Sequence, residues 1–327
     1  MTLVSIACIS YNQEKYIRNT IEGFLIQQTT FPFEIIIHDD ASTDKTAQII
    51  REYEQKYPNL IFPIIQIENQ FSKGIKRILA TFVFPKCRGK YIALCEGDDY
   101  WTDPNKLQKQ VDFLESNPDY GLVHTGYTIF SQNKKAFFNP PGKTPPSGKV
   151  FLNLLERNFI STLTVMAHTQ LLLEASKKLK RDQKFFIMGD YPLWLHIARK
   201  RKIGYINDIT AVYRFLENSA SHSKNVQSLI NFEKSVMDVV KYFALINSSQ
   251  QTEFIVRKRV SEIQNWIFHR LLKNPSLWKD NFDILSGFKP YKIWDKFAWK
   301  ILQRNKSYKI VILFFCFIKY LRDWGKE

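Results

Sequence analysis

The chain has 327 residues and a mass of 38.6 kDa, a length that suits one large domain or two modest ones. Hydrophobic residues make up 45% and charged residues 24%, which excludes a mostly disordered or collagen-like chain. The four cysteines include no Cys-x-x-Cys pair, so neither a zinc site nor a disulfide framework is expected. Two values are unusual, the aromatic content of 15% and the net charge of +16.

The net positive charge comes from the second part of the chain. Residues 1–128 carry 13 Lys and Arg against 16 Asp and Glu, a net charge of −3, whereas residues 129–327 carry 34 against 15, a net charge of +19. Basic surfaces attract nucleic acid, anionic lipid headgroups or phosphorylated substrates, and they also favour solubility alone. The asymmetry predicts two parts of the chain with different partners.

Neither end of the sequence resembles a secretory or membrane-spanning segment. The first residues lack the basic stretch of a signal peptide. The longest late apolar run, Ile310–Ile318, is far shorter than the about 20 residues that a spanning helix needs. We expect a cytoplasmic protein, with peripheral contact to the inner face of the cytoplasmic membrane as an open alternative.

The first half of the chain alternates short apolar runs with segments of helical periodicity. In chain order they predict strand Leu3–Ile9, helix Glu14–Gln28, strand Phe33–His38, a helix capped by Ser42 or Thr43, strand Leu60–Ile67, helix Lys73–Cys87, strand Tyr91–Cys95, a helix opened by Asp103 and Pro104, and strand Gly121–His124. This alternation is typical of βαβ units with a mainly parallel sheet, so the predicted fold class is α/β.

A segment rich in lysine and proline, Lys134–Lys149, predicts a mobile loop. The elements predicted after it are helix Val150–Asn158, strand Thr162–Ala167, helices Thr169–Leu179 and Asp190–Lys200, and strands Ile203–Ile206 and Thr210–Tyr213. From about Lys224 the chain is predicted to be wholly helical. The expected organisation is an α/β domain over 1–223, divided near residue 128, and a basic, aromatic helical region over 224–327.

Acidic residues follow two of the predicted strands. Asp39 and Asp40 end the second strand, and Asp98 and Asp99 come after Gly97 at the end of the fourth. Ligands of an open parallel sheet bind at the carboxyl ends of its strands, and crowded carboxylates are costly without a cation. The pattern fits a Mg²⁺ or Mn²⁺ site beside a phosphate-bearing ligand, with a solvated turn as the alternative for either pair.

Three blocks of sequence, Val4–Asn12, Asp39–Asp44 and Gly89–Asp99, occur in an order and at a spacing that can be compared with known families. Together they resemble the family 2 inverting glycosyltransferases of the GT-A fold, over about residues 1–220. The resemblance implies a Rossmann-like domain with a nucleotide-binding half (1–128) and an acceptor half (129–223). Bacterial members of this family build capsule, lipopolysaccharide and related surface glycans.

The resemblance implies a nucleotide site at the ends of the predicted strands. Ser10 and Tyr11 match nucleotide-binding positions. Tyr11 matches the residue that lies against the nucleobase, with a core tyrosine as the alternative. Asp40 matches the aspartate that accepts a hydrogen bond from a uracil ring N–H, which favours a UDP-sugar donor. Asn69 and Lys73 precede the next helix and match positions that contact the nucleotide.

The resemblance also implies a metal and diphosphate site. Asp98 and Asp99 match the Asp-x-Asp position, with Asp99 as the direct ligand of Mn²⁺ or Mg²⁺ and Asp98 as a contact to ribose or to a metal-bound water. Arg214, in a Tyr-Arg motif, matches a contact to the pyrophosphate. The family often has a histidine where this chain has Leu216. His222 is the candidate replacement, with a surface histidine as the alternative.

The resemblance also implies an acceptor site at the segment Met188–Trp194, which resembles the family's acidic motif before a helix. Gly189 stands in place of the usual first acid. Asp190 would be the general base that deprotonates the acceptor hydroxyl, and it could cap the helix as well. Trp194 would stack on an acceptor sugar or belong to the core. A segment resembling one that lines related acceptor sites contains Asn158 and Thr162.

The predicted function is therefore sugar transfer from a UDP-sugar to a hydroxyl of a glycan acceptor, lipid-linked in the favoured version, in surface polysaccharide synthesis. The aromatic, basic tail fits either a membrane-interfacial helix or a helical cap. Alternatives are a nucleotidyltransferase, although Ser10–Lys15 contains no glycine, and a non-catalytic basic or partner protein. No nucleic-acid motif is present, so no nucleic-acid partner is expected. The oligomeric state is left open.

Overall fold

The computed structural model describes residues 2–140, 142–216, 223–289, 296 and 299–300. The chain divides into two compact units, Met1–Leu216 and Glu217–Glu327. None of the helices among the described residues combines the length and the apolar character needed to cross a membrane. Of the aromatic, basic tail, residues 290–327 lie outside the described residues, with the exception of Lys296, Trp299 and Lys300. His222 also lies outside the described residues.

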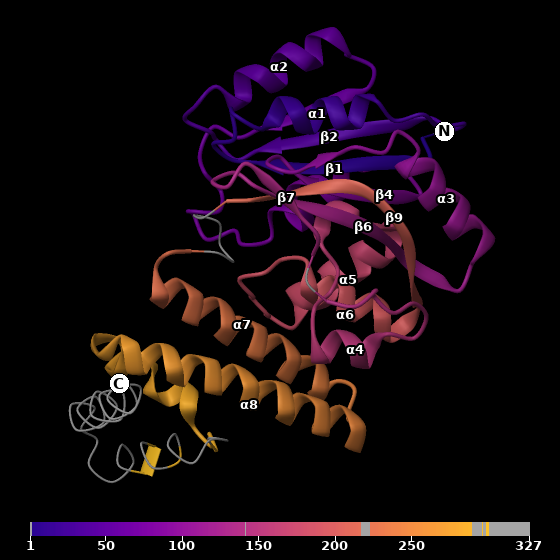
Figure 1. The fold of residues 1–327 in the computed structure, drawn as a ribbon. Coiled ribbons are helices and arrows are strands. Elements are labelled where there is room, and N and C mark those ends of the chain that lie inside the picture. Colours follow the sequence, from indigo (N-terminus) through magenta and orange to yellow (C-terminus); the bar gives the residue numbers. More distant parts are fainter. Residues whose placement is uncertain (1, 141, 217–222, 290–295, 297–298, 301–327) are drawn as a thin grey trace. The chain divides into compact units, whose positions relative to one another are not determined.

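The first unit is built on one sheet flanked by helices (Figure 1). In chain order its strands are β1 (Val4–Ser10), β2 (Phe33–Asp39), β3 (Ile61–Ile65), β4 (Tyr91–Glu96), β5 (Tyr100–Trp101), β6 (Tyr120–Ser131), β7 (Ala136–Phe138), β8 (Met166–His168) and β9 (Lys202–Phe215). Their spatial order in the sheet is β3-β2-β1-β4-β8-β6-β9-β5, with β7 beside β6. The longest pairings, among β1–β4 and between β6 and β9, are parallel. The predicted α/β class with a mainly parallel sheet is confirmed, and the short strands β5, β7 and β8 pair antiparallel.

Helices of the first unit cover the sheet with the apolar faces that the periodicity predicted. They are α1 (Ile17–Leu25), α2 (Thr46–Lys56), α3 (Lys106–Ser116), α4 (Phe151–Glu156), α5 (Thr169–Arg181) and α6 (Tyr191–Lys200). Buried side chains of α1, α2 and α3 share one core with β1, β2 and β4, including Ile21, Ile50 and Val111. Figure 1 shows α4, α5 and α6 grouped together below β6 and β9.

Several predicted boundaries are wrong for local reasons. The helix predicted over Lys73–Cys87 is reduced to a π-helical turn, Leu79–Val83, and a 3-10 turn, Phe84–Lys86. Helix α3 begins at Lys106 because Asn105 is its N-cap residue, while the Asp103 carboxylate accepts the Asn105 N–H. The first half of the strand predicted over Thr162–Ala167 is a 3-10 turn, Thr162–Thr164, before β8.

Two further corrections concern the region after residue 130. The strands predicted at Ile203–Ile206 and Thr210–Tyr213 are one strand, β9, which passes through a register shift against β6 near Gly126. The loop predicted over Lys134–Lys149 contains the short strand β7. The register shift against β6 accounts for the division of β9 in the prediction.

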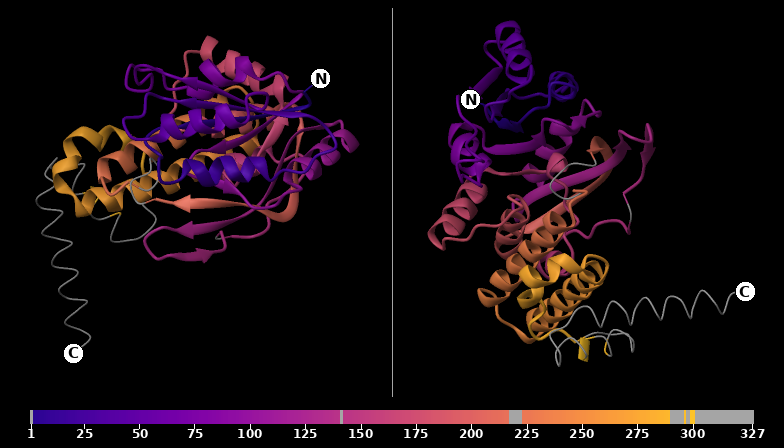
Figure 2. Two further views of the ribbon diagram at one scale, coloured as in Figure 1. Left: turned by 90° about the horizontal axis from the view of Figure 1, so that it is seen from above. Right: turned by 90° about the vertical axis from the view of Figure 1, so that its left-hand side faces the viewer.

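The second unit is helical, as predicted, throughout its described residues. Its helices are α7 (Val226–Leu245), α8 (Gln250–Lys273) and α9 (Trp278–Asn281), with 3-10 turns at Pro275–Leu277 and Phe282–Leu285. Asn225 and Ser249 cap the first two helices through their side chains. Aromatic rings gather in its core, where Phe268 contacts Trp278, Phe288 and Trp299. Figure 2 gives two further views of the ribbon.

Candidate active site

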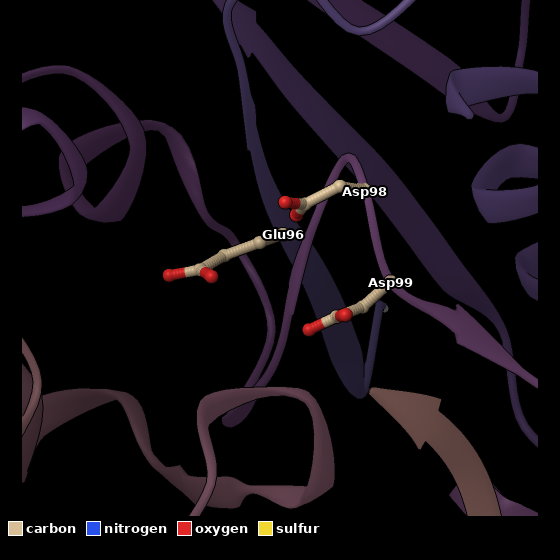
Figure 3. Close-up of side chains that lie close together, drawn as sticks. All are labelled: Glu96, Asp98 and Asp99. Atoms are coloured by element: carbon tan, nitrogen blue, oxygen red, sulfur yellow. The ribbon is translucent and has the colours of Figure 1, made fainter. Parts of the chain in front are cut away.

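Three acidic side chains meet at the turn between β4 and β5. The carboxylate oxygens of Glu96, Asp98 and Asp99 lie within 4.8 Å of one another (Figure 3). Burial raises the pKa of each carboxyl group, that of Glu96 to about 8, and the charge of Asp98 adds to the shift at Glu96 and Asp99. Oxygen ligands are what Mg²⁺ and Mn²⁺ prefer, and a cation among them would offset the mutual repulsion of the carboxylates.

Glu96 is the member of this cluster that the sequence interpretation missed. The signal was present, because Glu96 is the last residue of β4 and lies two positions before Asp98. Reading only the adjacent pair Asp98 and Asp99 left it out. Its carboxylate lies close enough to the pair to share a bound cation with them.

Hydrogen bonds from Thr20 and Arg214 hold the backbone of the acidic turn in place. The buried Thr20 hydroxyl, on α1, lies 2.9 Å from the Gly97 carbonyl oxygen and 2.6 Å from that of Asp99. Arg214 donates from Nε to the Asp98 carbonyl oxygen at 2.8 Å and from its backbone N–H to Asp99 Oδ1 at 2.7 Å. These bonds occupy the carbonyl oxygens of Gly97, Asp98 and Asp99 and one carboxylate oxygen of Asp99.

Aromatic rings surround the guanidinium group of Arg214. Its guanidinium lies over the rings of Tyr16, Tyr100 and Phe130, at 4.8, 5.2 and 5.8 Å from their centroids. It also donates to Gln132 Oε1 at 3.2 Å. The structure therefore places Arg214 as a brace of the acidic turn, beside the location where the resemblance implied a pyrophosphate contact.

Gly97 lies close to the end of β1. A β-carbon there would lie 2.4 Å from Gln13 Oε1 and 3.0 Å from the β-carbon of Ser10. A side chain at Gly97 would require the Gln13 side chain to move and would pack tightly against Ser10. The close approach joins the predicted nucleobase side and the acidic turn into one site.

The residues predicted for the nucleobase lie together at the ends of β1 and β2. Asp39 accepts hydrogen bonds from the hydroxyls of Ser10, at 3.2 Å, and Ser42, at 2.5 Å. Asp40 is buried, and its two carboxylate oxygens accept the backbone N–H groups of Gln70 and Phe71 at 2.8 and 3.0 Å. Asp39 therefore holds the turn after β2, and Asp40 fixes the loop that follows β3.

The other predicted nucleotide contacts differ in exposure. Tyr11 is 48% exposed at the end of β1, with a free ring surface. Asn69 is tied to the backbone, since its Nδ2 donates to the Asp40 carbonyl oxygen at 2.9 Å. Lys73 forms an ion pair with Glu68. A residue that the sequence interpretation missed here is His38, which is buried, stacks on Phe82 and contacts Gln66 through Nε2.

Asp190 is the N-cap residue of α6, as the sequence allowed. Its Oδ1 accepts the Tyr191 N–H at 2.7 Å, and its Oδ2 accepts the Thr162 hydroxyl at 3.0 Å. Burial raises the pKa of the Asp190 carboxyl group above its usual range, although both hydrogen bonds act in the opposite direction. The charge of Asp190 also contributes to the raised pKa of Glu96, so the two carboxylates belong to one electrostatic environment.

Among the predicted acceptor residues, Thr162 is the one that contacts Asp190. Asn158 is exposed, and its Oδ1 accepts the Ile160 N–H at 3.2 Å. Trp194 is fully buried on α6. Stacking of Trp194 on a sugar is therefore not supported, because the indole has no exposed face, and the alternative of a core tryptophan fits the structure.

Comparison with known proteins places this architecture in a family. The family model described as glycosyl transferase family 2 matches residues 5–168. The chain belongs to glycosyl transferase family 2. The prediction of a glycosyltransferase is thereby confirmed, and the nucleotidyltransferase and non-enzyme alternatives lose their support.

Similar proteins extend the comparison. An uncharacterized protein of Mycobacterium tuberculosis is 35% identical over 279 residues, 83% of this chain and 76% of that protein. The putative teichuronic acid biosynthesis glycosyltransferase TuaG of Bacillus subtilis is 28% identical, and the Escherichia coli enzyme named UDP-Glc:alpha-D-GlcNAc-diphosphoundecaprenol beta-1,3-glucosyltransferase WfaP is 29% identical. Each of these two matches 68% of this chain and 82% of its own length.

A solved structure supports the GT-A-like fold. The mannosyltransferase PcManGT from Pyrobaculum calidifontis, in complex with GDP-Man and Mn²⁺, has a TM-score of 0.54 and 14% sequence identity, covering 95% of this chain and 83% of that chain. At this identity the likeness concerns the fold alone. The relatives place the chain among glycosyltransferases whose named members take part in polysaccharide synthesis.

Proposed function

We propose that the protein is a metal-dependent, inverting glycosyltransferase that moves a sugar from a UDP-sugar to a hydroxyl of a lipid-linked glycan during surface polysaccharide synthesis. The observation that carries the proposal is the cluster of Glu96, Asp98 and Asp99 in one environment with the carboxylate of Asp190. The name of the similar Escherichia coli enzyme WfaP, with a UDP-Glc donor and a diphosphoundecaprenol-linked acceptor, supports the choice of substrates.

The acidic cluster is proposed to hold the donor end of the reaction. Glu96, Asp98 and Asp99 would bind Mn²⁺ or Mg²⁺, which supplies the positive charge that stabilises a departing diphosphate. Tyr11 offers an exposed ring at the end of β1 for the nucleobase. Thr20 and Arg214 hold the backbone of the turn that carries the carboxylates.

Asp190 is proposed to act at the acceptor end. Its carboxylate takes the proton of the acceptor hydroxyl while the hydroxyl oxygen forms a bond to the anomeric carbon. The bond from that carbon to the diphosphate oxygen breaks, and its electron pair leaves with UDP. Direct displacement inverts the anomeric centre. The raised pKa makes Asp190 a stronger base than an exposed aspartate, provided that it is ionised.

The test separates chemistry from binding. Sugar transfer from UDP-glucose, UDP-galactose and their N-acetylated forms to a lipid-linked glycan extract is followed by mass analysis of the products. Asp190→Asn keeps the helix cap and should abolish transfer while UDP binding is retained, whereas Asp99→Asn should weaken both. Full transfer activity in either variant contradicts the assigned role.

A matched control is Asp112→Asn, because Asp112 is an exposed carboxylate on α3 outside the site. This variant should transfer sugar at the wild-type rate. A comparable loss in the control would mean that the assay reports general surface charge, and not the acidic cluster.

A further inference from the structure

The hairpin formed by β6 and β7 exposes aromatic side chains that the proposed site does not use. Its register pairs Phe130 with Phe137 and Ile129 with Phe138. Phe137 is 60% exposed and Phe138 is 42% exposed. Large aromatic side chains at such exposure are costly in water unless another surface covers them.

An open groove runs beside this hairpin. It has a volume of about 450 Å³, and Phe137 and Phe138 form part of its lining together with Thr102, Thr128, Asn139, Ile209 and Val212. Ile209, on the neighbouring strand β9, is itself 57% exposed. The apolar side chains of the hairpin and of β9 therefore form one continuous exposed surface. We call Phe137, Phe138 and Ile209, with the lysines of the hairpin turn, the hairpin patch.

The charged side chains of the hairpin and of the loop that follows it are all basic. No Asp or Glu occurs between Asp119 and Glu156, whereas four lysines do, all of them exposed: Lys134, Lys135, Lys143 and Lys149. Lys134 and Lys135 form the turn of the hairpin, and the Lys134 ammonium lies 5.5 Å from the ring centroid of Phe138. Asp208, next to Ile209, is engaged by Lys109 at 2.6 Å. The lysines have no acidic partner within the described part of the chain.

We propose that the hairpin patch docks on a bilayer of anionic lipid. Phenylalanine rings partition into the headgroup region, and lysine side chains extend toward anionic headgroups from the same depth, so both features of the patch are satisfied by one partner. A neutral glycan would leave the lysines without partners. The docking surface goes beyond the proposed function and requires no transfer activity. It would hold the first unit at the surface where lipid-linked acceptors are found.

The test is sedimentation of the full-length protein with vesicles made of equal parts phosphatidylglycerol and phosphatidylcholine, and with vesicles of phosphatidylcholine alone. Lys134→Glu/Lys135→Glu should weaken binding to the anionic vesicles by about 25-fold or more, from about fivefold for each lysine lost. Phe137→Ser/Phe138→Ser should weaken it by about tenfold. Neutral vesicles should bind all proteins weakly.

Matched controls have the same changes on other surfaces of the first unit. Lys56→Glu/Lys86→Glu alters the net charge equally at exposed positions on α2 and before β4, and Ile26→Ser removes an apolar side chain with 42% exposure. Equal loss in the control and hairpin variants would overturn the proposal. The proposal would also be overturned if the hairpin variants bound vesicles as the wild type does but transferred less sugar to a soluble glycan. That result would assign the groove to a glycan.

Discussion

The Thr20 hydroxyl provides a sharp test of how the acidic turn is held. Thr20 is fully buried, and its Oγ1 lies 2.6 Å from the Asp99 carbonyl oxygen and 2.9 Å from the Gly97 carbonyl oxygen. Thr20→Val keeps the shape of the side chain but removes this donor. Leaving a buried acceptor unsatisfied costs about 1–3 kcal/mol. We expect the free energy of unfolding to fall by about that amount.

The same change should act on metal binding as well as on stability. If the two carbonyl oxygens turn toward water or toward the site, the carboxylates of Asp98 and Asp99 move with them. We expect the affinity for Mn²⁺ in the presence of UDP to fall by about tenfold, which corresponds to about 1.4 kcal/mol. Urea unfolding measures the first effect, and calorimetric titration with Mn²⁺ measures the second.

Thr20→Ser is the matched variant, because it keeps the hydroxyl and removes one buried methyl group. It should lose about 1 kcal/mol of stability and retain the wild-type affinity for Mn²⁺. The reasoning would be refuted if Thr20→Val and Thr20→Ser lost the same stability and both kept full Mn²⁺ affinity, because the hydroxyl would then make no difference to the turn.

Three other predictions concern the surroundings of the site. Thr162→Val removes the donor to Asp190 Oδ2 and should raise the pKa of Asp190 further, so the acidic limb of the kcat profile against pH should shift to higher pH. Burial lowers the pKa of Lys106 to about 7, so between about pH 7 and 10 the unfolded chain binds one more proton there than the native protein. The free energy of unfolding of the wild type should therefore rise by about 1.4 kcal/mol per pH unit relative to that of Lys106→Met. The prediction is contradicted if urea unfolding gives a difference in free energy between the two proteins that does not change with pH. Arg214→Lys keeps the charge but loses the Nε bond to the Asp98 carbonyl oxygen, and it should weaken UDP binding in the presence of Mn²⁺ by several-fold in a thermal-shift titration, whereas unchanged binding would remove Arg214 from the brace.

The sequence predicted the strands that build the site because these strands are buried on both faces. Continuous apolar runs, such as Phe33–His38 and Tyr91–Cys95, leave little choice of conformation, and the acidic residues directly after them mark the carboxyl ends. The N-cap role of Asp190 was equally local, since Pro192 follows in the first turn of the helix. Local chemistry was sufficient for these elements.

The contacts that complete the site come from distant parts of the chain. Thr20 reaches the acidic turn from α1, and its position does not differ in sequence from that of an ordinary buried threonine. Arg214 reaches the turn from β9, and its motif indicated a pyrophosphate contact but not the bond to the Asp98 carbonyl oxygen. Strand β9 was divided into two because exposed residues around Asp208 interrupt its apolar pattern at the register shift. Pairing partners, which local patterns do not encode, determine these features.

The central claim is that Glu96, Asp98 and Asp99 hold a divalent cation for a nucleotide-sugar donor. Calorimetric titration of UDP into the protein, with and without Mn²⁺, tests it most directly when the wild type is compared with Asp99→Asn and with Asp112→Asn. We predict that Mn²⁺ strengthens UDP binding to the wild type and to Asp112→Asn, and that this gain is lost in Asp99→Asn. An equal gain from Mn²⁺ in all three proteins would contradict the account.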